Sequence, residues 1–205
     1  MIENPEEIAA HFFEQLKTIQ EQLILDADFI LSSDPAAKEK IEVIAVYPGF
    51  FAIFCYRIAH ILAKIAVPLL PRMITEYAHK VTGIDIHPNA IIGTPFSIDH
   101  GTGIVIGETA VIGINIKMYQ GVTLGALSVD KKEASVKRHP TIEDNVILYA
   151  GCTILGGNTT IGHHSTIGGN VWLTESIAPY SIVYHKSEVI VRNSKDLRST
   201  INFVI

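Results

Sequence analysis

From residue 84 onward the sequence repeats with a period of six residues, and this period constrains the fold more than any other feature of the chain. Written in sixes, it reads IDIHPN AIIGTP FSIDHG TGIVIG ETAVIG INIKMY QGVTLG, and after fourteen intervening residues PTIEDN VILYAG CTILGG NTTIGH HSTIGG NVWLTE SIAPYS. Self-similarity at a short fixed period is typical of a stacked solenoid.

One position in thirteen of the fourteen hexads carries an aliphatic residue, which we expect to fill the interior of the solenoid. These residues are Ile86, Ile92, Ile98, Ile106, Ile112, Met118, Leu124, Ile142, Leu148, Leu155, Ile161, Ile167 and Leu173. The spacing slips to eight residues between Ile98 and Ile106 and to seven between Leu148 and Leu155. Four residues after most of them comes a small or β-branched residue, for example Ala90 and Thr102, which we expect beside the next corner.

The repeat predicts a triangular parallel β-helix, in which each hexad forms a short strand and a tight corner. Glycine suits corners that need a positive φ. Fourteen hexads at three per coil give between four and five coils. An ordinary β-sandwich of short strands is the alternative, but strand alternation does not produce a six-residue glycine period.

The residues before the repeat include residue types that begin and end helices. Asn4 is a candidate N-cap, Pro5 suits the first helical position, and an apolar stripe follows at spacings of three and four residues. A second helix is expected to start at Asp34-Pro35-Ala36. Pro48-Gly49 marks a further break.

The helix expected after Pro48-Gly49 has one polar face and is otherwise apolar. Arg57, His60 and Lys64 share the polar face, so we expect the helix to pack on its other three sides. A shorter helix is expected over about 71–81.

Composition narrows the range of functions. The formal net charge is −5 and the pI is about 6.0, which argues against a nucleic-acid partner. Cys55 and Cys152 form neither a disulfide framework nor a zinc motif. The acidic N-terminus reads as neither a secretory signal nor a transit peptide, and charged residues and prolines interrupt the apolar stretch 43–70. We therefore expect a cytoplasmic protein with no membrane span.

Five ordered motifs stand out within and between the hexads. They are Asp85-Ile86-His87-Pro88, Ile98-Asp99-His100-Gly101-Thr102-Gly103, Gly107-Glu108-Thr109, Gln120-Gly121-Val122-Thr123-Leu124-Gly125 and Lys137-Arg138-His139-Pro140. Together they resemble the motifs of the serine O-acetyltransferase family of the hexapeptide-repeat acyltransferases. The resemblance implies an α+β chain: an N-terminal α-helical domain over 1–82, and a left-handed parallel β-helix of hexapeptide repeats over 83–182. A loop over 126–139 interrupts the β-helix, and a tail over 183–205 follows it.

The resemblance also implies a reaction, the transfer of acetyl from acetyl-CoA to the hydroxyl of L-serine in cysteine biosynthesis. A hydroxyl is a poor nucleophile until a base takes its proton, and histidine titrates near neutrality. By resemblance, His100 is that base and Asp85 orients it. His139 lies across the cleft, where it holds the substrate or assists proton transfer.

The remaining site residues are likewise implied by the resemblance. Arg138 offers a fork to the serine carboxylate, and Asp34 and Asp99 supply negative charge for the serine ammonium. Glu108 is a further candidate at the substrate site, with a solvated corner carboxylate as the alternative. The residues expected at the acetyl-CoA site are Gly125, Ala150 and Gly168, and the loop 126–139 is expected to cover the acetyl-CoA channel.

Two other functions remain open from the residues. One is acetyl transfer to another hydroxyl, such as that of a sugar, although a neutral sugar has no ammonium for Asp34 and Asp99 to bind. The other is a β-helix that serves only as a binding scaffold. No metal is expected, because the adjacent His163 and His164 would point to opposite faces of a strand.

The resemblance extends to partners. It implies a homotrimer or a dimer of trimers, with active sites between neighbouring subunits. The apolar C-terminus ends at Ile205. In the family, a terminal isoleucine inserts into the active site of O-acetylserine sulfhydrylase. The alternative is a terminus packed on its own trimer.

Overall fold

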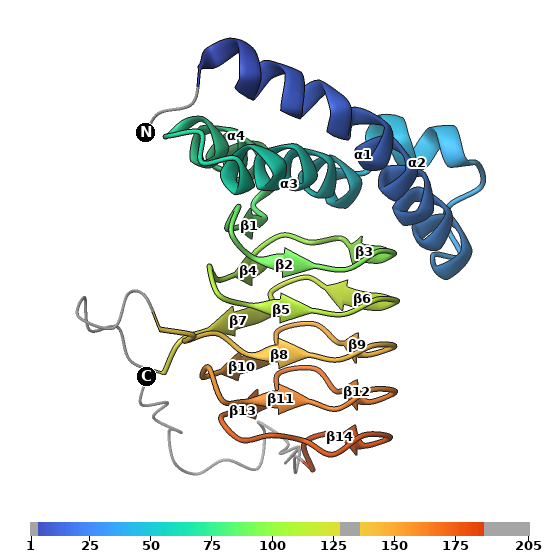
Figure 1. Ribbon diagram of the computed structural model, residues 1–205. Coiled ribbons are helices and arrows are strands. Elements are labelled where there is room, and N and C mark those ends of the chain that lie inside the picture. The colour runs from blue at the N-terminus through green and yellow to red at the C-terminus, as the bar shows by residue number, and fades with distance from the viewer. Residues whose placement is uncertain (1–3, 128–135, 187–205) are drawn as a thin grey trace, which may run out of the picture.

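The computed structural model describes residues 4–127 and 136–186 (Figure 1). Four helices come first: α1 (Pro5–Ser33), α2 (Lys40–Val46), α3 (Pro48–Lys64) and α4 (Leu70–Thr82). All described strands follow them, stacked below the helices in Figure 1. The predicted order, helices and then a parallel β-helix, is confirmed.

The strands form three parallel sheets, because each strand pairs with the equivalent strands of the adjacent coils. The first sheet contains β1 (Asp85–Ile86), β4 (Val105–Ile106), β7 (Thr123–Gly125), β10 (Thr153–Leu155) and β13 (Trp172–Leu173). The second contains β2 (Ile91–Ile92), β5 (Val111–Ile112), β8 (Thr141–Ile142) and β11 (Thr160–Ile161). The third contains β3 (Phe96–Asp99), β6 (Ile116–Tyr119), β9 (Ile147–Leu148), β12 (Thr166–Ile167) and β14 (Ile182–Val183). A triangular β-helix results, and the β-sandwich alternative is wrong.

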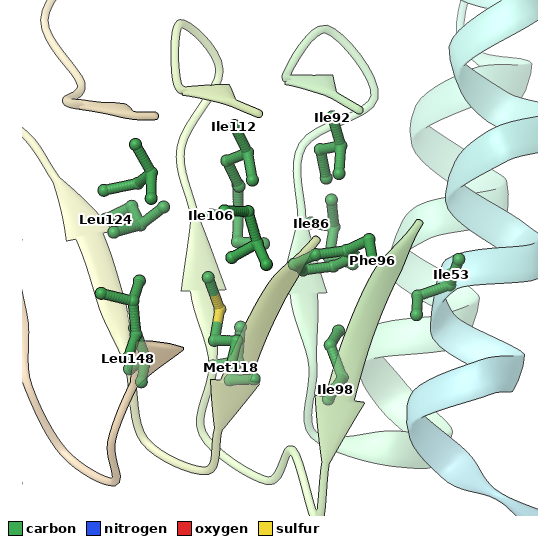
Figure 2. Close-up of a cluster of buried hydrophobic side chains, with 14 of the residues drawn as sticks. Ile53, Ile86, Ile92, Phe96, Ile98, Ile106, Ile112, Met118, Leu124 and Leu148 are labelled. Atoms are coloured by element: carbon green, nitrogen blue, oxygen red, sulfur yellow. The ribbon is translucent and has the colours of Figure 1, made fainter. Parts of the chain in front are cut away.

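Aliphatic side chains stack in register along the inside of the prism (Figure 2). Ile86, Ile106 and Leu124 are consecutive partners on the first sheet, and all are buried. The third sheet places Ile98, Met118 and Leu148 in a second stack, also buried. Burial of such side chains stabilises the fold by about 25 cal/mol per Å² of apolar surface.

Two of the predicted residue positions are wrong. One is the interior residue of the coil that contains β10, and the other is the small residue expected beside the corner after Ile98. Ile154, not Leu155, pairs with Leu124 and is fully buried, so the seven-residue slip lies after Ile154. Ile104 is buried where Thr102 was expected, and Thr102 is exposed. Both differences arise because the fit against the neighbouring coil, and not the count of residues, decides which side chain points inward.

Helix α3 covers the first coil with the face that carries Arg57. The Arg57 guanidinium donates to both carboxylate oxygens of Asp26 in α1, at 2.5 and 2.8 Å, and to the Gly93 carbonyl at 3.0 Å. Asp26 Oδ1 also accepts the Phe96 N–H at 2.8 Å. The expected orientation is therefore wrong: Arg57 is buried, whereas Phe54 on an apolar face is 39% exposed. The polar side chains satisfy backbone groups that the open end of the first coil leaves unpaired.

Asp34 does not start a second helix. It follows the last residue of α1, its Oδ1 accepts the Ala36 N–H at 2.8 Å, and its Oδ2 accepts the Tyr47 hydroxyl at 2.8 Å. This side chain closes a turn, and α2 begins only at Lys40. The expected first helix is confirmed, with Asn4 as its cap.

Among the described residues, no individual helix has both the length and the apolar content that a membrane crossing requires. Helices α2 and α3 reach those values only when they are counted together, across a 71° bend.

Candidate active site

The predicted site residues lie at two different edges of the triangular prism. One edge, where the chain passes from the third sheet to the first, contains His100 and is called the His100 corner below. The other, where the chain passes from the first sheet to the second, contains His139 and is called the His139 corner. The full width of the first sheet separates these two edges. A single chain therefore does not bring His100 and His139 together.

The His100 corner is enlarged by the eight-residue slip between Ile98 and Ile106. His100 adopts a left-handed backbone conformation with φ 59°, followed by Gly101 at φ 88°. This conformation is uncommon for a residue with a Cβ. It turns the imidazole outward, where the side chain is 73% exposed.

Two carboxylates lie close to the exposed imidazole. His100 Nε2 is 3.6 Å from Asp99 Oδ1. The turn after α1 brings Asp34 to the same hollow, and Tyr47 and Thr102 also contribute to its wall. The hollow thus combines a possible proton acceptor with two groups that can bind a cation.

The volume of this hollow is about 750 Å³, which is ample for an amino acid. The Ala36 N–H lowers the pKa of Asp34, and the Tyr47 hydroxyl and the charge of Lys117 act in the same direction. The bond to Asp34 also raises the pKa of Tyr47 to about 12. Asp34 is therefore ionised at neutral pH.

Lys117 and Tyr47 support this corner, and neither was predicted from the sequence. Lys117 Nζ lies 3.6 Å from Asp99 Oδ2 and donates to the Ser33 carbonyl at 2.7 Å. It thereby joins the end of α1 to the third sheet. For Lys117 the sequence shows only a lysine on a strand with apolar neighbours, and such a lysine is usually exposed to solvent without a specific role.

The His139 corner holds a second imidazole in a very different setting. His139 is only 8% exposed, and its ring packs on Gly107, where an added Cβ would overlap the ring. The Thr109 N–H donates to His139 Nδ1 at 3.0 Å. Burial, and then the positive charge of Arg138, lower the pKa of His139 to about 4.

Arg138 and Glu108 form an ion pair beside His139. Asn89 donates to the other Glu108 oxygen at 3.1 Å. Burial opposes the charge of Glu108, but the hydrogen bonds from Arg138 and Asn89 prevail and lower its pKa. Glu108 thus contacts Arg138 directly within the chain, and the corner offers a cation and an imidazole to an anionic group.

Asp85 lies at the start of β1, where α4 approaches the first sheet. One ligand-type atom from each of Glu76, His79 and Asp85 lies within 4.8 Å of the others. These three side chains could reach a common metal ion, although Glu76 already pairs with Arg72 and contacts His79 at 3.5 Å. The pairing of Asp85 with His100, and the absence of a metal, stay predictions.

The three residues expected at the acetyl-CoA site are divided between the two prism edges that border the first sheet. Ala150 and Gly168 belong to the His100 corner, in later coils, whereas Gly125 ends β7 just before the loop 126–139. Of that loop, residues 128–135 lie outside the described residues. A Cβ at Gly168 would lie 2.9 Å from the Val183 carbonyl oxygen, so coil stacking alone accounts for this glycine. The acetyl-CoA role of all three stays a prediction.

The sequence predicts that His163 and His164 point to opposite faces of a strand, and this prediction is wrong. They lie at a corner and not within a strand, and His164 has φ 58°. This backbone conformation brings the two Nδ1 atoms to 2.9 Å. The rule of alternating faces applies only to extended backbone.

A scan of protein-family models finds no match to the chain. The chain is similar, however, to a plasmid serine acetyltransferase of Synechococcus elongatus, with 49% identity over 86% of this chain and 57% of the relative. A serine acetyltransferase of Bacillus licheniformis is 43% identical over 93% of this chain and 83% of the relative. The chain thus spans little more than half the length of the first of these relatives and most of the second.

Solved structures agree with these relatives. Serine acetyltransferase isoform 3 of Entamoeba histolytica, in complex with cysteine, superposes with a TM-score of 0.83 at 42% identity, over 93% of this chain and 67% of that one. The Neisseria gonorrhoeae serine acetyltransferase in complex with serine gives 0.79 at 32%, over 90% and 76%. A serine acetyltransferase in complex with CoA gives 0.76 at 31%, over 88% and 77%. The match confirms the predicted left-handed β-helix, and the chain belongs to the serine acetyltransferase family of the hexapeptide-repeat acyltransferases.

Proposed function

We propose that this chain transfers the acetyl group of acetyl-CoA to the hydroxyl of L-serine and so forms O-acetylserine. The observation that carries the proposal is the exposed His100 imidazole beside Asp99, in a hollow that Asp34 also lines. A base next to two carboxylates suits an acceptor that combines a hydroxyl with an ammonium group. A sugar would leave both carboxylates without a cationic partner, and a pure scaffold would need none of these groups.

His100 acts as the general base in this proposal. It takes the proton of the serine hydroxyl while the oxygen attacks the thioester carbon, and the resulting imidazolium returns the proton to the departing thiolate of CoA. One C–O bond forms and one C–S bond breaks. Asp34 and Asp99 hold the serine ammonium, and Asp85 orients the base.

The transfer is direct, without an acyl-enzyme. Cys152 is fully buried inside the prism, and burial raises the pKa of its thiol to about 12. Cys55 is also buried, and burial raises its pKa. Since only a thiolate is a good nucleophile, neither cysteine is suited to accept the acetyl group.

A complete site requires a second protomer. The His100 corner supplies the base, and the His139 corner supplies Arg138 and His139 for the serine carboxylate, but the first sheet keeps them apart within one chain. We place the site between neighbouring subunits of a homotrimer, with a dimer of trimers as the larger assembly. Acetyl-CoA then lies between Ala150 and Gly168 of one subunit and Gly125 of the next.

Two further parts of the proposal rest on the family alone. The protein works in the cytoplasm, in cysteine biosynthesis. Its C-terminal Ile205 binds in the active site of O-acetylserine sulfhydrylase. Ile205 lies outside the described residues, so calorimetry of the intact chain and of a chain without Ile205 against the sulfhydrylase tests this part.

One assay tests the central proposal. Release of free thiol from acetyl-CoA is followed with L-serine, with sugars and with simple alcohols as acceptors. We expect L-serine to be preferred strongly over acceptors that lack the ammonium or the carboxylate. A sugar that matches or exceeds L-serine would overturn the choice of acceptor. Light scattering under assay conditions tests the assembly, and an active monomer would contradict the shared site.

A further inference from the structure

Thr109 contacts the Arg138–His139 pair through two of its atoms and the neighbouring Lys137 through a third. Its N–H donates to His139 Nδ1 at 3.0 Å, and its Oγ1 lies 2.9 Å from the same nitrogen. The same Oγ1 accepts the Arg138 N–H at 2.9 Å and the His139 N–H at 3.0 Å. Its carbonyl accepts from Lys137 Nζ at 3.1 Å. One residue thus holds both the backbone and the ring of the pair.

These contacts determine where the imidazole proton lies. A backbone N–H can only donate, so His139 Nδ1 must present its lone pair to Thr109. Two N–H groups already occupy the lone pairs of Oγ1, so the Thr109 hydroxyl proton is directed to Nδ1 as well. Neutral His139 therefore carries its proton on Nε2. Protonation of Nδ1 would set an N–H against two donors.

The charges around His139 favour the same neutral form. Arg138 and Lys137 are the cations next to it, and the positive charge of a protonated His87 acts in the same direction. Glu108 opposes them, but it is already paired with Arg138. Since the ring is also almost fully buried, a second proton is costly there, in line with the low pKa of His139.

We propose that Thr109 is a positioning residue that fixes His139 as a neutral imidazole with its proton on Nε2, so that His139 donates a hydrogen bond to a substrate oxygen and takes no proton from the acceptor. The inference rests on the proposed function, because it divides the work of that site between two histidines. The exposed His100 exchanges the proton, and His139 serves as a fixed donor beside Arg138. Donation to a carboxylate would act mainly on KM, and donation to the developing oxyanion mainly on kcat.

The tautomer is measured without reference to activity. Nitrogen-15 NMR spectra of the assembled, histidine-labelled protein are recorded between pH 5.5 and 9. The His139 signals are identified by their absence from the spectrum of His139→Gln. We expect a protonated Nε2, an unprotonated Nδ1 and no titration over this range. A proton on Nδ1, or a titration midpoint between pH 6 and 8, would overturn the inference. This result stands even if L-serine proves not to be the acceptor.

Variants of Thr109 test the positioning role. Thr109→Val keeps the shape and the N–H but removes Oγ1, whereas Thr109→Ser keeps both polar groups. We expect Thr109→Val to lower kcat/KM for L-serine by roughly 10-fold or more and to raise the titration midpoint of His139, with the KM for acetyl-CoA little changed. Thr109→Ser should restore both. Equal behaviour of the two variants in both measurements would contradict the role of Oγ1.

Variants of His139 separate a donor from a base even if Thr109→Val does not fold. The Gln amide can place an N–H near the position of Nε2, but it cannot accept a proton at neutral pH. We expect His139→Gln to retain at least about 10-fold more activity than His139→Ala, which loses roughly 10²-fold as when an oxyanion donor is removed. Equal loss in the two variants would contradict a donor role.

Discussion

The ring of His139 rests directly on the backbone of Gly107, with no room for a Cβ between them. Gly107 has no positive φ, so its backbone accepts alanine and the steric conflict is confined to the ring. We expect Gly107→Ala to displace the imidazole and to lower kcat/KM for L-serine by about 10²-fold, because misplacing a group by about 1 Å can cost that much. Steady-state kinetics measure this effect, with the thermal midpoint as the control for folding. A normal kcat/KM would show that the position of the ring is not critical.

Loss of the imidazole at His100 should be the most damaging change at the His100 corner. We expect His100→Ala to lower kcat by roughly 10²–10⁴-fold, because a positioned general base contributes that much. Asp85→Asn should cost less, since the base remains. His11→Ala, on the exposed surface of α1, is the matched control and should be neutral. Near-normal activity of His100→Ala would refute its assignment as the base.

Arg138→Lys should weaken the binding of L-serine more than it slows the reaction. A lysine supplies the charge but not the planar fork that holds a carboxylate through two bonds. We expect the KM for L-serine to rise by about 10-fold, while the KM for acetyl-CoA stays close to its normal value. Initial rates with each substrate varied in turn distinguish the two. A selective change in the KM for acetyl-CoA would instead place Arg138 at the cofactor.

The buried pair of Asp26 and Arg57 should be sensitive to the loss of one partner. Arg57→Met leaves the Asp26 carboxylate buried without its cation, and we expect this to cost about 3–5 kcal/mol of stability. The double variant Asp26→Leu/Arg57→Met removes both charges and should recover part of that loss. Denaturant unfolding at fixed protein concentration gives the comparison. Additive losses in the double variant would rule out coupling between the two residues.

Stability should fall as the pH is lowered from about 6.5 to 4. Folding lowers the pKa of His139 to about 4, and burial lowers the pKa of His60 and His87. The unfolded chain therefore binds more protons in this interval, so the free energy of unfolding rises with pH. For His139 the difference amounts to roughly 3 kcal/mol. Urea unfolding at several pH values measures the slope, which should be smaller in His139→Gln. An unchanged slope would contradict the low pKa of His139.

Much of the site could be anticipated only because its residues belong to local motifs. His100 stands in the eight-residue slip between Ile98 and Ile106, and Arg138-His139 ends an insertion between two hexads. A break in a strict repeat is visible in the sequence. The roles of Thr109 and Tyr47 were not visible, because each depends on a hydrogen bond to a residue far along the chain: His139 for Thr109 and Asp34 for Tyr47.

The sequence by itself determined the β-helix, because a spacing of eighteen residues, three repeats of six, places Ile106 and Leu124 one above the other on the same sheet. Only the tertiary structure decided where that register breaks, since Ile154 and Leu155 are both aliphatic and the preceding coil selects between them. It also decided that Arg57 is buried, because the open end of the first coil supplies carbonyls that a solvent-exposed arginine would not meet. The separation of His100 and His139 belongs to this second class. Insertions such as the one before His139 obscure which edge of the prism a corner occupies, and that edge determines which residues can meet within one chain.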